Sequence, residues 1–301
     1  MTHEYKAGEG VAVQVVGESE RGDPFYITGP AVISFSGGRT SSYMLYRILQ
    51  AHGGTLPDDV VVCFANTGRE MSETLDFVRD CGAAWNVPIV WLEYRWKPGG
   101  PWAEVVSHNS ASRDGTPFEM KLVAGSALPN PVQRSCTTEL KIRTIKRWVR
   151  AILKWDHWSN VIGLRADEMR RVERTKRPTK DRWTVATPLA DAGITLADVR
   201  AFWKAQPFDL RLAGPWEGNC DGCFLKSRAA IMRMHRDHPD QMKWWAKMEA
   251  VKRGVAGLER TFRKDREPYA ELARIVEQTP MLIPDETMIE GGEGCEMYCG
   301  V

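Results

Sequence analysis

Residues 32–45, VISFSGGRTSSYML, decide the fold of this chain. An apolar run leads directly into Gly37 and Gly38, and three small hydroxyl residues follow at 40–42. Glycine permits backbone angles closed to other residues and lets a ligand approach the main chain, while hydroxyl residues favour a helix start. The stretch therefore predicts a strand, a glycine turn and a helix N-terminus that presents free amides to an anion such as phosphate. An empty tight turn is the alternative for a Gly-Gly pair taken alone.

Apolar strands alternate with helices along the first two thirds of the chain. The predicted elements are strands at residues 31–35, 60–65, 87–94 and 161–164, and helices at residues 40–52, 72–81 and 141–155. Continuous apolar strands separated by helices are typical of a parallel sheet covered on both faces. We therefore predict an α/β, Rossmann-like fold followed by a mainly helical C-terminal region.

Three regions are expected along the chain. Residues 1–29 form a lead-in segment, residues 30–210 form the α/β domain, and residues 211–301 form a cysteine-containing, mainly helical region with a flexible tail. Residues 98–131 are rich in glycine and proline, and predict a long loop with a short helix.

Composition excludes few classes of protein. The 301 residues include 41 basic and 39 acidic ones, so the net charge of +2 indicates no particular partner. Apolar runs such as residues 60–65 are too short to span a bilayer, and the N-terminus has no signal-peptide pattern. We expect a cytoplasmic protein without a membrane partner. Seven cysteines in such a chain indicate metal or redox chemistry rather than a disulfide framework.

Three motifs follow directly on predicted strands. They are SGGRTS at residues 36–41, NTGRE at residues 66–70 and GLRADEMRR at residues 163–171. Ligands of parallel sheets lie beyond the carboxyl ends of the strands. The three motifs are therefore expected at one edge of the sheet.

In this order the motifs resemble the phosphoadenosine phosphosulfate (PAPS) reductase family of the PP-loop adenine-nucleotide superfamily, over roughly residues 31–225. The resemblance implies a PP-loop fold that binds an adenylyl nucleotide, either ATP or a sulfonucleotide such as PAPS or APS. The residues implied for nucleotide binding are Ser36, Gly37, Gly38, Arg39, Ser41, Asn66, Thr67, Gly68 and Glu70. Members that split ATP carry an aspartate, which helps to organise Mg²⁺, where this chain has Thr40. That departure weakens the ATP alternative and its Mg²⁺ requirement.

Residues 165–182 contain eight basic and four acidic residues. A guanidinium group grips phosphate or sulfate oxygens in a bidentate fashion. Arg165 and Arg171 are predicted to bind the anion at the sheet edge and to act in catalysis. Lys176, Arg177 and Lys180 are expected on a solvated loop rather than at a site. The basic helix face of residues 141–150 is expected in solvent, with nucleic acid as the alternative partner.

The cysteines carry the most specific signal. Cys220 and Cys223 form a C-x-x-C motif, and Cys136 lies upstream. In iron–sulfur members of the resembled family, a Cys-Cys pair and a later C-x-x-C bind a 4Fe–4S cluster. Here the pair is reduced to Cys136, so the resemblance implies three cluster ligands. Cys295 is the expected fourth, with Cys299 or an open iron as alternatives. Zinc and unliganded thiols remain open as well.

Two enzymatic functions and one binding function are compatible with these motifs. A reductase uses Cys299 as the nucleophile on a sulfonucleotide and a thioredoxin-like electron donor. Its C-terminal segment resembles residues 298–301, although this chain lacks the expected glutamate and histidine. A thiolation enzyme activates a nucleic-acid base with ATP. The third alternative is a non-catalytic nucleotide- or nucleic-acid-binding module with structural zinc. The sequence predicts no oligomeric state.

Several residues receive structural interpretations. Cys63 and Cys81 are expected as small core residues, and the pair Trp244 and Trp245 is expected in the helical core. The histidines of the C-terminal region, His235 among them, are expected on helix surfaces.

Overall fold

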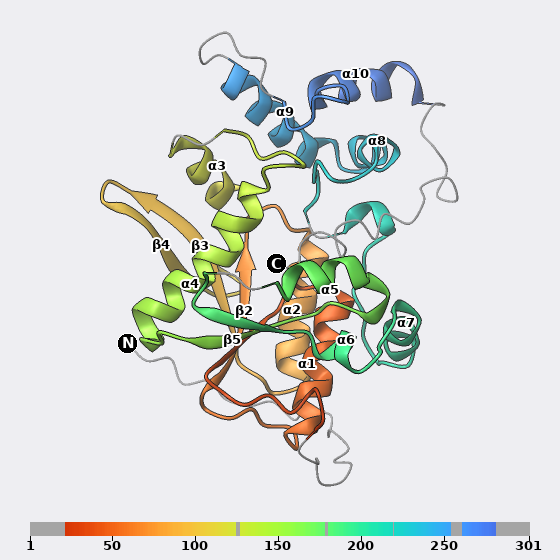
Figure 1. The fold of residues 1–301 in the computed structure, drawn as a ribbon. Coiled ribbons are helices and arrows are strands. Elements are labelled where there is room, and N and C mark those ends of the chain that lie inside the picture. The colour runs from red at the N-terminus through yellow and green to blue at the C-terminus, as the bar shows by residue number, and fades with distance from the viewer. Residues whose placement is uncertain (1–21, 125–126, 178–179, 219, 254–260, 281–301) are drawn as a thin grey trace. The chain divides into compact units, whose positions relative to one another are not determined.

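The chain forms an α/β fold built on one six-stranded sheet. The computed structural model describes residues 22–124, 127–177, 180–218, 220–253 and 261–280. Within them a mostly parallel sheet, in the order β4-β3-β2-β1-β5-β6, is flanked by helices and followed by a helical C-terminal region (Figure 1). The predicted fold class is confirmed.

β1 is a central, buried strand of the sheet and pairs with a neighbour on each side. The strands are β1 (Ala31–Ser34), β2 (Val60–Asn66), β3 (Ile89–Lys97), β4 (Gly100–Val106), β5 (Trp158–Ile162) and β6 (Trp183–Ala186). β1 pairs in parallel with β2 and with β5, in a register that sets Ser34 beside Cys63 and Ile162. Its first three residues are fully buried, as expected of a strand covered on both faces.

Two edge strands were not predicted. β4 lies in the segment expected to be a long loop, and it pairs antiparallel with β3. The loop prediction is therefore wrong for Gly100–Val106. β6 pairs in parallel with β5 and sets Trp183 beside Trp158. Both edge strands are only partly buried, so neither carries the continuous apolar run by which a central strand is recognised.

The helices follow the predicted periodicity with shifted ends. They are α1 (Arg39–Ala51), α2 (Ser72–Ala84), α3 (Thr116–Val123), α4 (Arg143–Trp148), α5 (Met169–Thr175), α6 (Pro188–Asp191), α7 (Leu196–Lys204), α8 (Arg228–Asp237), α9 (Pro239–Arg253) and α10 (Tyr269–Gln278). α2 continues through Gly82, where its end was predicted. π-helical turns at Thr137–Ile142 and Val149–Leu153 extend α4 at both ends, so this helix begins directly after Cys136.

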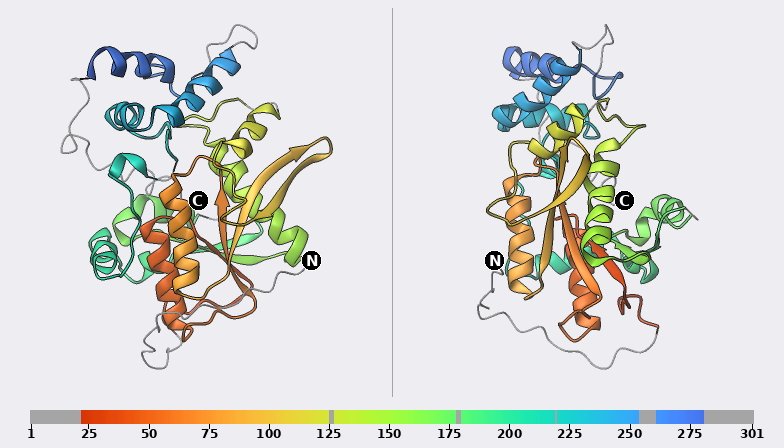
Figure 2. Two further views of the ribbon diagram at one scale, coloured as in Figure 1. Left: turned by 180° about the vertical axis from the view of Figure 1, so that it is seen from behind. Right: turned by 90° about the vertical axis from the view of Figure 1, so that its left-hand side faces the viewer.

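The described residues divide into two compact units that interleave along the chain. Unit 1 comprises the described residues up to Phe64 together with Leu75–Val90 and Trp155–Leu210. Unit 2 comprises Ala65–Thr74, Trp91–Lys154 and the described residues from Arg211 onward. Residues 65–74 and 91–154 thus group with the C-terminal helices rather than with the rest of residues 30–210. The elements of each unit can be followed in the further views (Figure 2).

In unit 1, α7 anchors the start of α1. The indole Nε1 of Trp203 donates a hydrogen bond of 2.8 Å to the carbonyl oxygen of Arg39. The rings of Tyr43 and Phe202 also pack against each other, with centroids 4.6 Å apart. These contacts hold the first turn of α1 in place beside the glycine turn.

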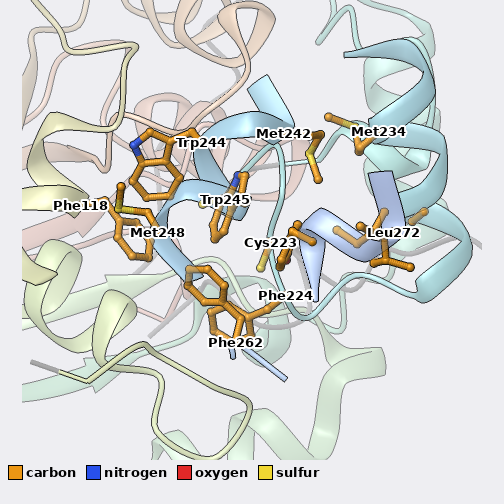
Figure 3. Close-up of a cluster of buried hydrophobic side chains, with 14 of the residues drawn as sticks. Phe118, Cys223, Phe224, Met234, Met242, Trp244, Trp245, Met248, Phe262 and Leu272 are labelled. Carbon is orange, nitrogen blue, oxygen red and sulfur yellow. The ribbon is translucent and has the colours of Figure 1, made fainter. Parts of the chain in front are cut away.

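In unit 2, aromatic and sulfur-containing side chains form the core. Trp244 and Trp245 are buried, as predicted, and the side chains of Cys223 and Phe224 lie in the same cluster (Figure 3). The buried carboxylate of Glu249 accepts hydrogen bonds from the backbone N–H groups of Phe262 and Tyr269, at 3.0 and 2.8 Å. A buried charge that receives such donors ties α9 to the start of α10.

No helix among the described residues is both long enough and apolar enough to cross a membrane.

The prediction that His235 lies on a helix surface is wrong. His235 is 6% exposed in α8, and its Nε2 atom has no hydrogen-bond partner. Its ring lies near Tyr269, with centroids 6.2 Å apart. Burial, and secondarily the nearby charge of Arg266, lower the pKa of His235 to about 4.

This buried histidine makes the free energy of unfolding sensitive to acid. The unfolded chain protonates His235 near pH 6.5, whereas the folded chain does so only near its lowered pKa of about 4. Stability should therefore fall as the pH drops below 6.5, by about 2 kcal/mol between pH 7 and pH 5 from this residue alone. His235→Leu should flatten that slope in urea unfolding. His157→Gln, at an exposed position, should keep it, and equal slopes in the wild type and His235→Leu would contradict the assignment.

Candidate functional site

The glycine turn of unit 1 joins the end of β1 to α1. Gly37 has a positive φ of 79°, which favours glycine, and Gly38 precedes the first helical residue. No side-chain hydrogen bond caps α1, and its first turn carries no acidic residue. Ser36 Oγ lies 2.9 Å from Ser41 Oγ, and the Ser36 N–H donates to the same oxygen at 3.2 Å. The turn thus combines two adjoining hydroxyls with an uncapped helix N-terminus.

Arg165 brings a buried cation to this helix start. It follows β5, the parallel neighbour of β1, and is 2% exposed. Its Nη1 donates to Thr40 Oγ1 at 3.1 Å, and its Nε donates to Asp167 at 3.0 Å. Glu168 accepts a hydrogen bond of 3.0 Å from the Arg165 backbone N–H. The guanidinium is therefore oriented before any ligand binds.

The other two candidate arginines of unit 1 are engaged differently. Arg171 forms an ion pair with Glu168, the residue whose carboxylate also accepts from the Arg165 backbone N–H. Arg39 donates to both carboxylate oxygens of Asp209, at 2.7 and 2.9 Å, and to the carbonyl of Leu210 at 2.7 Å. The Arg39 side chain therefore holds the first residue of α1 to the segment at Asp209 and Leu210. Its backbone amide is the group of Arg39 that belongs to the glycine turn.

Gly163 lets β5 approach the start of α1. A Cβ atom at this position would lie 3.1 Å from Ser41 Cα and 3.3 Å from Ser41 N. These are main-chain atoms of the helix, so they cannot move aside cheaply. Sequence analysis placed Gly163 in a motif without assigning it this role.

In unit 2, the NTGRE turn is held by its own side chains. Asn66 Nδ2 donates to Glu93 at 2.6 Å, and Asn66 Oδ1 accepts from the Gly68 N–H at 3.0 Å. The Thr67 N–H and hydroxyl both donate to Glu70, at 2.9 and 2.8 Å. These internal bonds fix the turn, and its side chains were predicted for nucleotide binding.

The same turn is bound to the C-x-x-C loop by backbone hydrogen bonds and an ion pair. Glu70 pairs with Cys220 in an antiparallel bridge, and the Asp221 N–H donates to the Arg69 carbonyl at 2.8 Å. The side chains of Arg69 and Asp221 form a buried ion pair. Trp245 Nε1 also donates to Asp221, at 2.7 Å. Burial raises the pKa of the Asp221 carboxyl, and Arg69 and Trp245 oppose that shift.

Three cysteines line one small cavity in unit 2. Cys136, Cys220 and Cys223 border a space of about 20 Å³. Thr67 Oγ1 lies 3.8 Å from Cys220 Sγ, and Cys223 lies beside Trp245 in the aromatic core (Figure 3). Three of the positions that the resemblance implied as cluster ligands therefore line one cavity, although Cys136 precedes the C-x-x-C motif by more than 80 residues.

Two cations share this cavity with the thiols. Arg134 and Lys141 line it, and Lys141 Nζ lies 3.5 Å from Glu70. Lys141 was expected on a solvent-facing helix surface, and that expectation is wrong. The signal that sequence reasoning missed is spacing: Arg134 precedes Cys136 by two residues, and Lys141 follows it by little more than one helical turn.

The cavity offers three thiol ligands, but these thiols do not converge on one point as the ligands of a single metal ion do. A single zinc ion needs its sulfur ligands about 2.3 Å from one centre. Among the described residues no three Cys, His, Asp or Glu side chains meet such a requirement. In a 4Fe–4S cluster each thiolate binds a different iron. Its cysteine ligands are therefore spread around the cluster rather than directed at one point. The three cysteines are of the ligand type that such a cluster requires, and the cavity of about 20 Å³ would have to widen to hold it.

The remaining cysteines divide into two groups. Cys63 and Cys81 are fully buried, as predicted, and burial raises the pKa of both thiols. Their thiolate forms are disfavoured, so they are poor ligands. Cys295 and Cys299, predicted as the fourth ligand and the nucleophile, lie outside the described residues.

Comparison with known proteins gives one informative result. No protein-family model matches the chain. The uncharacterized nin region protein ORF290 of Escherichia phage lambda is 30% identical over 205 residues, which cover 66% of this chain and 67% of that protein. Identity at this level over two thirds of both chains indicates common descent, and the chain belongs to the same family as this phage lambda protein.

Proposed function

We propose that this protein binds an adenylyl nucleotide and performs sulfur chemistry, as a PAPS reductase-like enzyme with an iron–sulfur cluster. The observation that carries the proposal is the buried Arg165 guanidinium, held 3.1 Å from Thr40 Oγ1 at the uncapped start of α1. A fixed cation beside free helix amides suits a phosphate or sulfate group. The sequence resemblance supplies the adenylyl part of the ligand.

Several groups of unit 1 would each contribute to binding the anion. The helix dipole contributes about 0.3–1 kcal/mol, and up to about 2 kcal/mol where the site is partly buried. The Ser41 hydroxyl donates to the Gly38 carbonyl at 3.0 Å and lies 2.9 Å from Ser36 Oγ, so the Ser36 hydroxyl is the donor that can point toward an oxyanion. Arg165 adds a charge-assisted hydrogen bond, and its side-chain hydrogen bonds to Asp167 and Thr40 keep the guanidinium oriented. Because these groups are already in place, binding requires little reorganisation.

Cys136, Cys220 and Cys223 would hold a 4Fe–4S cluster in unit 2, with Cys295 proposed as the fourth ligand. Such a cluster supplies an electron-rich iron–sulfur surface for sulfur chemistry. Arg134 and Lys141 line the same cavity and would favour thiolates over thiols. The buried Arg69–Asp221 ion pair holds the C-x-x-C loop in its conformation.

The proposed reaction is the reduction of a sulfonucleotide. The Cys299 thiolate attacks the sulfur, an S–S bond forms, and the S–O bond to the nucleotide phosphate breaks. A dithiol protein of the thioredoxin type then reduces the enzyme thiosulfonate and releases sulfite, becoming a disulfide itself. Arg165, assisted by Arg171 through Glu168, neutralises the oxyanions.

A second candidate, ATP-dependent thiolation of a nucleic-acid base, is favoured by one observation. The Cys-Cys pair of the resembled family is reduced here to Cys136, flanked by Ser135 and Thr137, and Ser135 Oγ accepts a hydrogen bond of 2.7 Å from the buried Lys121. That side chain is unavailable as a thiolate ligand. An iron without a cysteine ligand would suit the binding of sulfide for transfer to a base.

The nucleotide site can be tested at Gly163. Gly163→Val would force its side chain against the Ser41 backbone and displace the start of α1. Isothermal titration calorimetry should show a loss of affinity for PAPS or ATP of about 10-fold or more, since about 1.4 kcal/mol of anion binding would be lost. Gly218→Ala is the matched control, because its Cβ would meet only Pro215 O, at 3.9 Å. Unchanged affinity in a folded Gly163→Val protein would place the nucleotide elsewhere.

The cluster can be tested by anaerobic purification with iron and sulfide analysis. The wild type should be brown, and Cys220→Ala or Cys223→Ala should lose the colour because each removes one edge ligand. Cys81→Ala should retain it, since Cys81 is buried away from the cavity set. A protein that binds zinc without iron or sulfide would support the non-catalytic module instead.

Product analysis separates the two enzymatic candidates. With PAPS and reduced thioredoxin, a reductase releases sulfite, and Cys299→Ser should abolish that release while nucleotide binding persists. Sulfite release that survives in Cys299→Ser would remove this thiol from the mechanism. A wild type that releases no sulfite but incorporates labelled sulfide into RNA or DNA with ATP would establish thiolation.

A further inference from the structure

Unit 1 has a concave surface at the amino-terminal ends of its strands. A groove of about 840 Å³ is lined by the residues that precede or begin β1, β5 and β6, including Pro30, Trp158 and Trp183. The anion site described above lies beyond the carboxyl ends of β1 and β5. Because these strands are parallel, the groove lies at the other edge of the sheet and is a separate site.

The walls of the groove carry several cations. Lys176 and Arg177 enter it from the end of α5, while Arg182 and His157 enter from the residues before β6 and β5. All four residues are exposed. Asp181 is the acidic residue among those that line it, so cations dominate the lining.

Two of these cations form exposed ion pairs with aspartates, and a phosphate group could replace the aspartates at little cost in free energy. Lys176 pairs with Asp191, and Arg182 pairs with Asp156 at 3.1 Å. Both partners of each pair are at least 41% exposed at the side chain. Such surface ion pairs contribute about 0–1 kcal/mol, which a phosphate can replace.

Two indole rings are among the side chains that line the groove. Trp158 and Trp183 are paired across β5 and β6, with ring centroids 5.4 Å apart and planes 33° from parallel. Trp158 is buried, and Trp183 is partly exposed. Trp183 therefore contributes a partly exposed indole to the groove lining, packed beside the ring of Trp158.

We propose that this groove binds single-stranded nucleic acid, with Lys176, Arg177 and Arg182 on the phosphates and Trp183 under a base. A basic groove with an aromatic platform is the usual arrangement for single strands. The volume of 840 Å³ exceeds what one inorganic anion needs. A duplex keeps its bases stacked on one another, so it would leave the Trp183 face unused.

This role accounts for residues that the proposed nucleotide chemistry leaves unexplained. Lys176 and Arg177 were expected in solvent, and both are exposed where they line the groove. The inference goes beyond the proposed function and does not depend on it, because its test measures binding without nucleotide, cluster or turnover.

The test is fluorescence anisotropy of the full-length protein with a labelled 12-nucleotide oligo(dT) and oligo(U). Lys176→Gln/Arg177→Gln should weaken binding about 10-fold or more and lower the slope of log K against log salt by about 1.4, since each phosphate contact on a single strand contributes about 0.7. Trp183→Ala should weaken binding about 10-fold, and Trp183→Phe should retain most of the affinity. Thermal melts check that each variant is folded.

A charge-matched variant on another basic surface is the control. Arg143→Gln/Arg150→Gln removes two charges from α4 and the turn that follows it, and should change the affinity less than about 2-fold, because the groove contacts remain. Equal losses in the two double variants would assign binding to bulk charge and overturn the proposal. A wild type that binds neither oligonucleotide at 50 mM salt, or binds duplex DNA as tightly as single strands, would overturn it as well.

Discussion

A buried ion pair between Arg69 and Asp221 organises the thiol cavity of unit 2. Burying two charges is costly unless each is fully satisfied. Asp221 also accepts hydrogen bonds from the Gly222 N–H at 2.6 Å and from the Trp245 indole at 2.7 Å. Arg69 also donates to the carbonyl of Gln241 at 2.8 Å, and its guanidinium lies 5.0 Å from the Trp244 ring. The C-x-x-C loop is therefore fixed by the protein itself, which makes the two cysteines a preorganised pair.

The parts of the fold that the sequence predicted are those with local signals. β1, its glycine turn and α1 follow one another within 21 residues, and each has a characteristic pattern of apolar, glycine or hydroxyl residues. β4 and β6 escaped prediction because edge strands are half exposed and their composition resembles that of loops. The end of α2 was misplaced because tertiary packing tolerates Gly82 inside a helix.

The sequence predicted which residues belong to the candidate site, but it did not predict the hydrogen bonds and ion pairs between them. Arg165 was expected near the glycine turn because strand order places it there, and the structure adds the bond to Thr40. The Arg69–Asp221 pair joins residues 152 positions apart, which no local pattern indicates. Lys141 was misassigned for the same reason. Its partner Glu70 lies on another segment, so a helical periodicity argument could place it only on a basic face.

The charges around the glycine turn favour a metal-free oxyanion over a magnesium–ATP complex. Mg²⁺ is bound through carboxylates and phosphate oxygens, and ATP-splitting relatives of the resembled family have an aspartate at the position of Thr40. Here that position carries a hydroxyl that accepts a hydrogen bond from Arg165, and the first turn of α1 has no acidic residue. In the function proposed above, the Arg165 guanidinium would supply the positive charge that a divalent ion supplies elsewhere. Because arginine binds sulfate and phosphate oxygens directly, this arrangement is the reason that we propose a sulfonucleotide rather than ATP as the ligand.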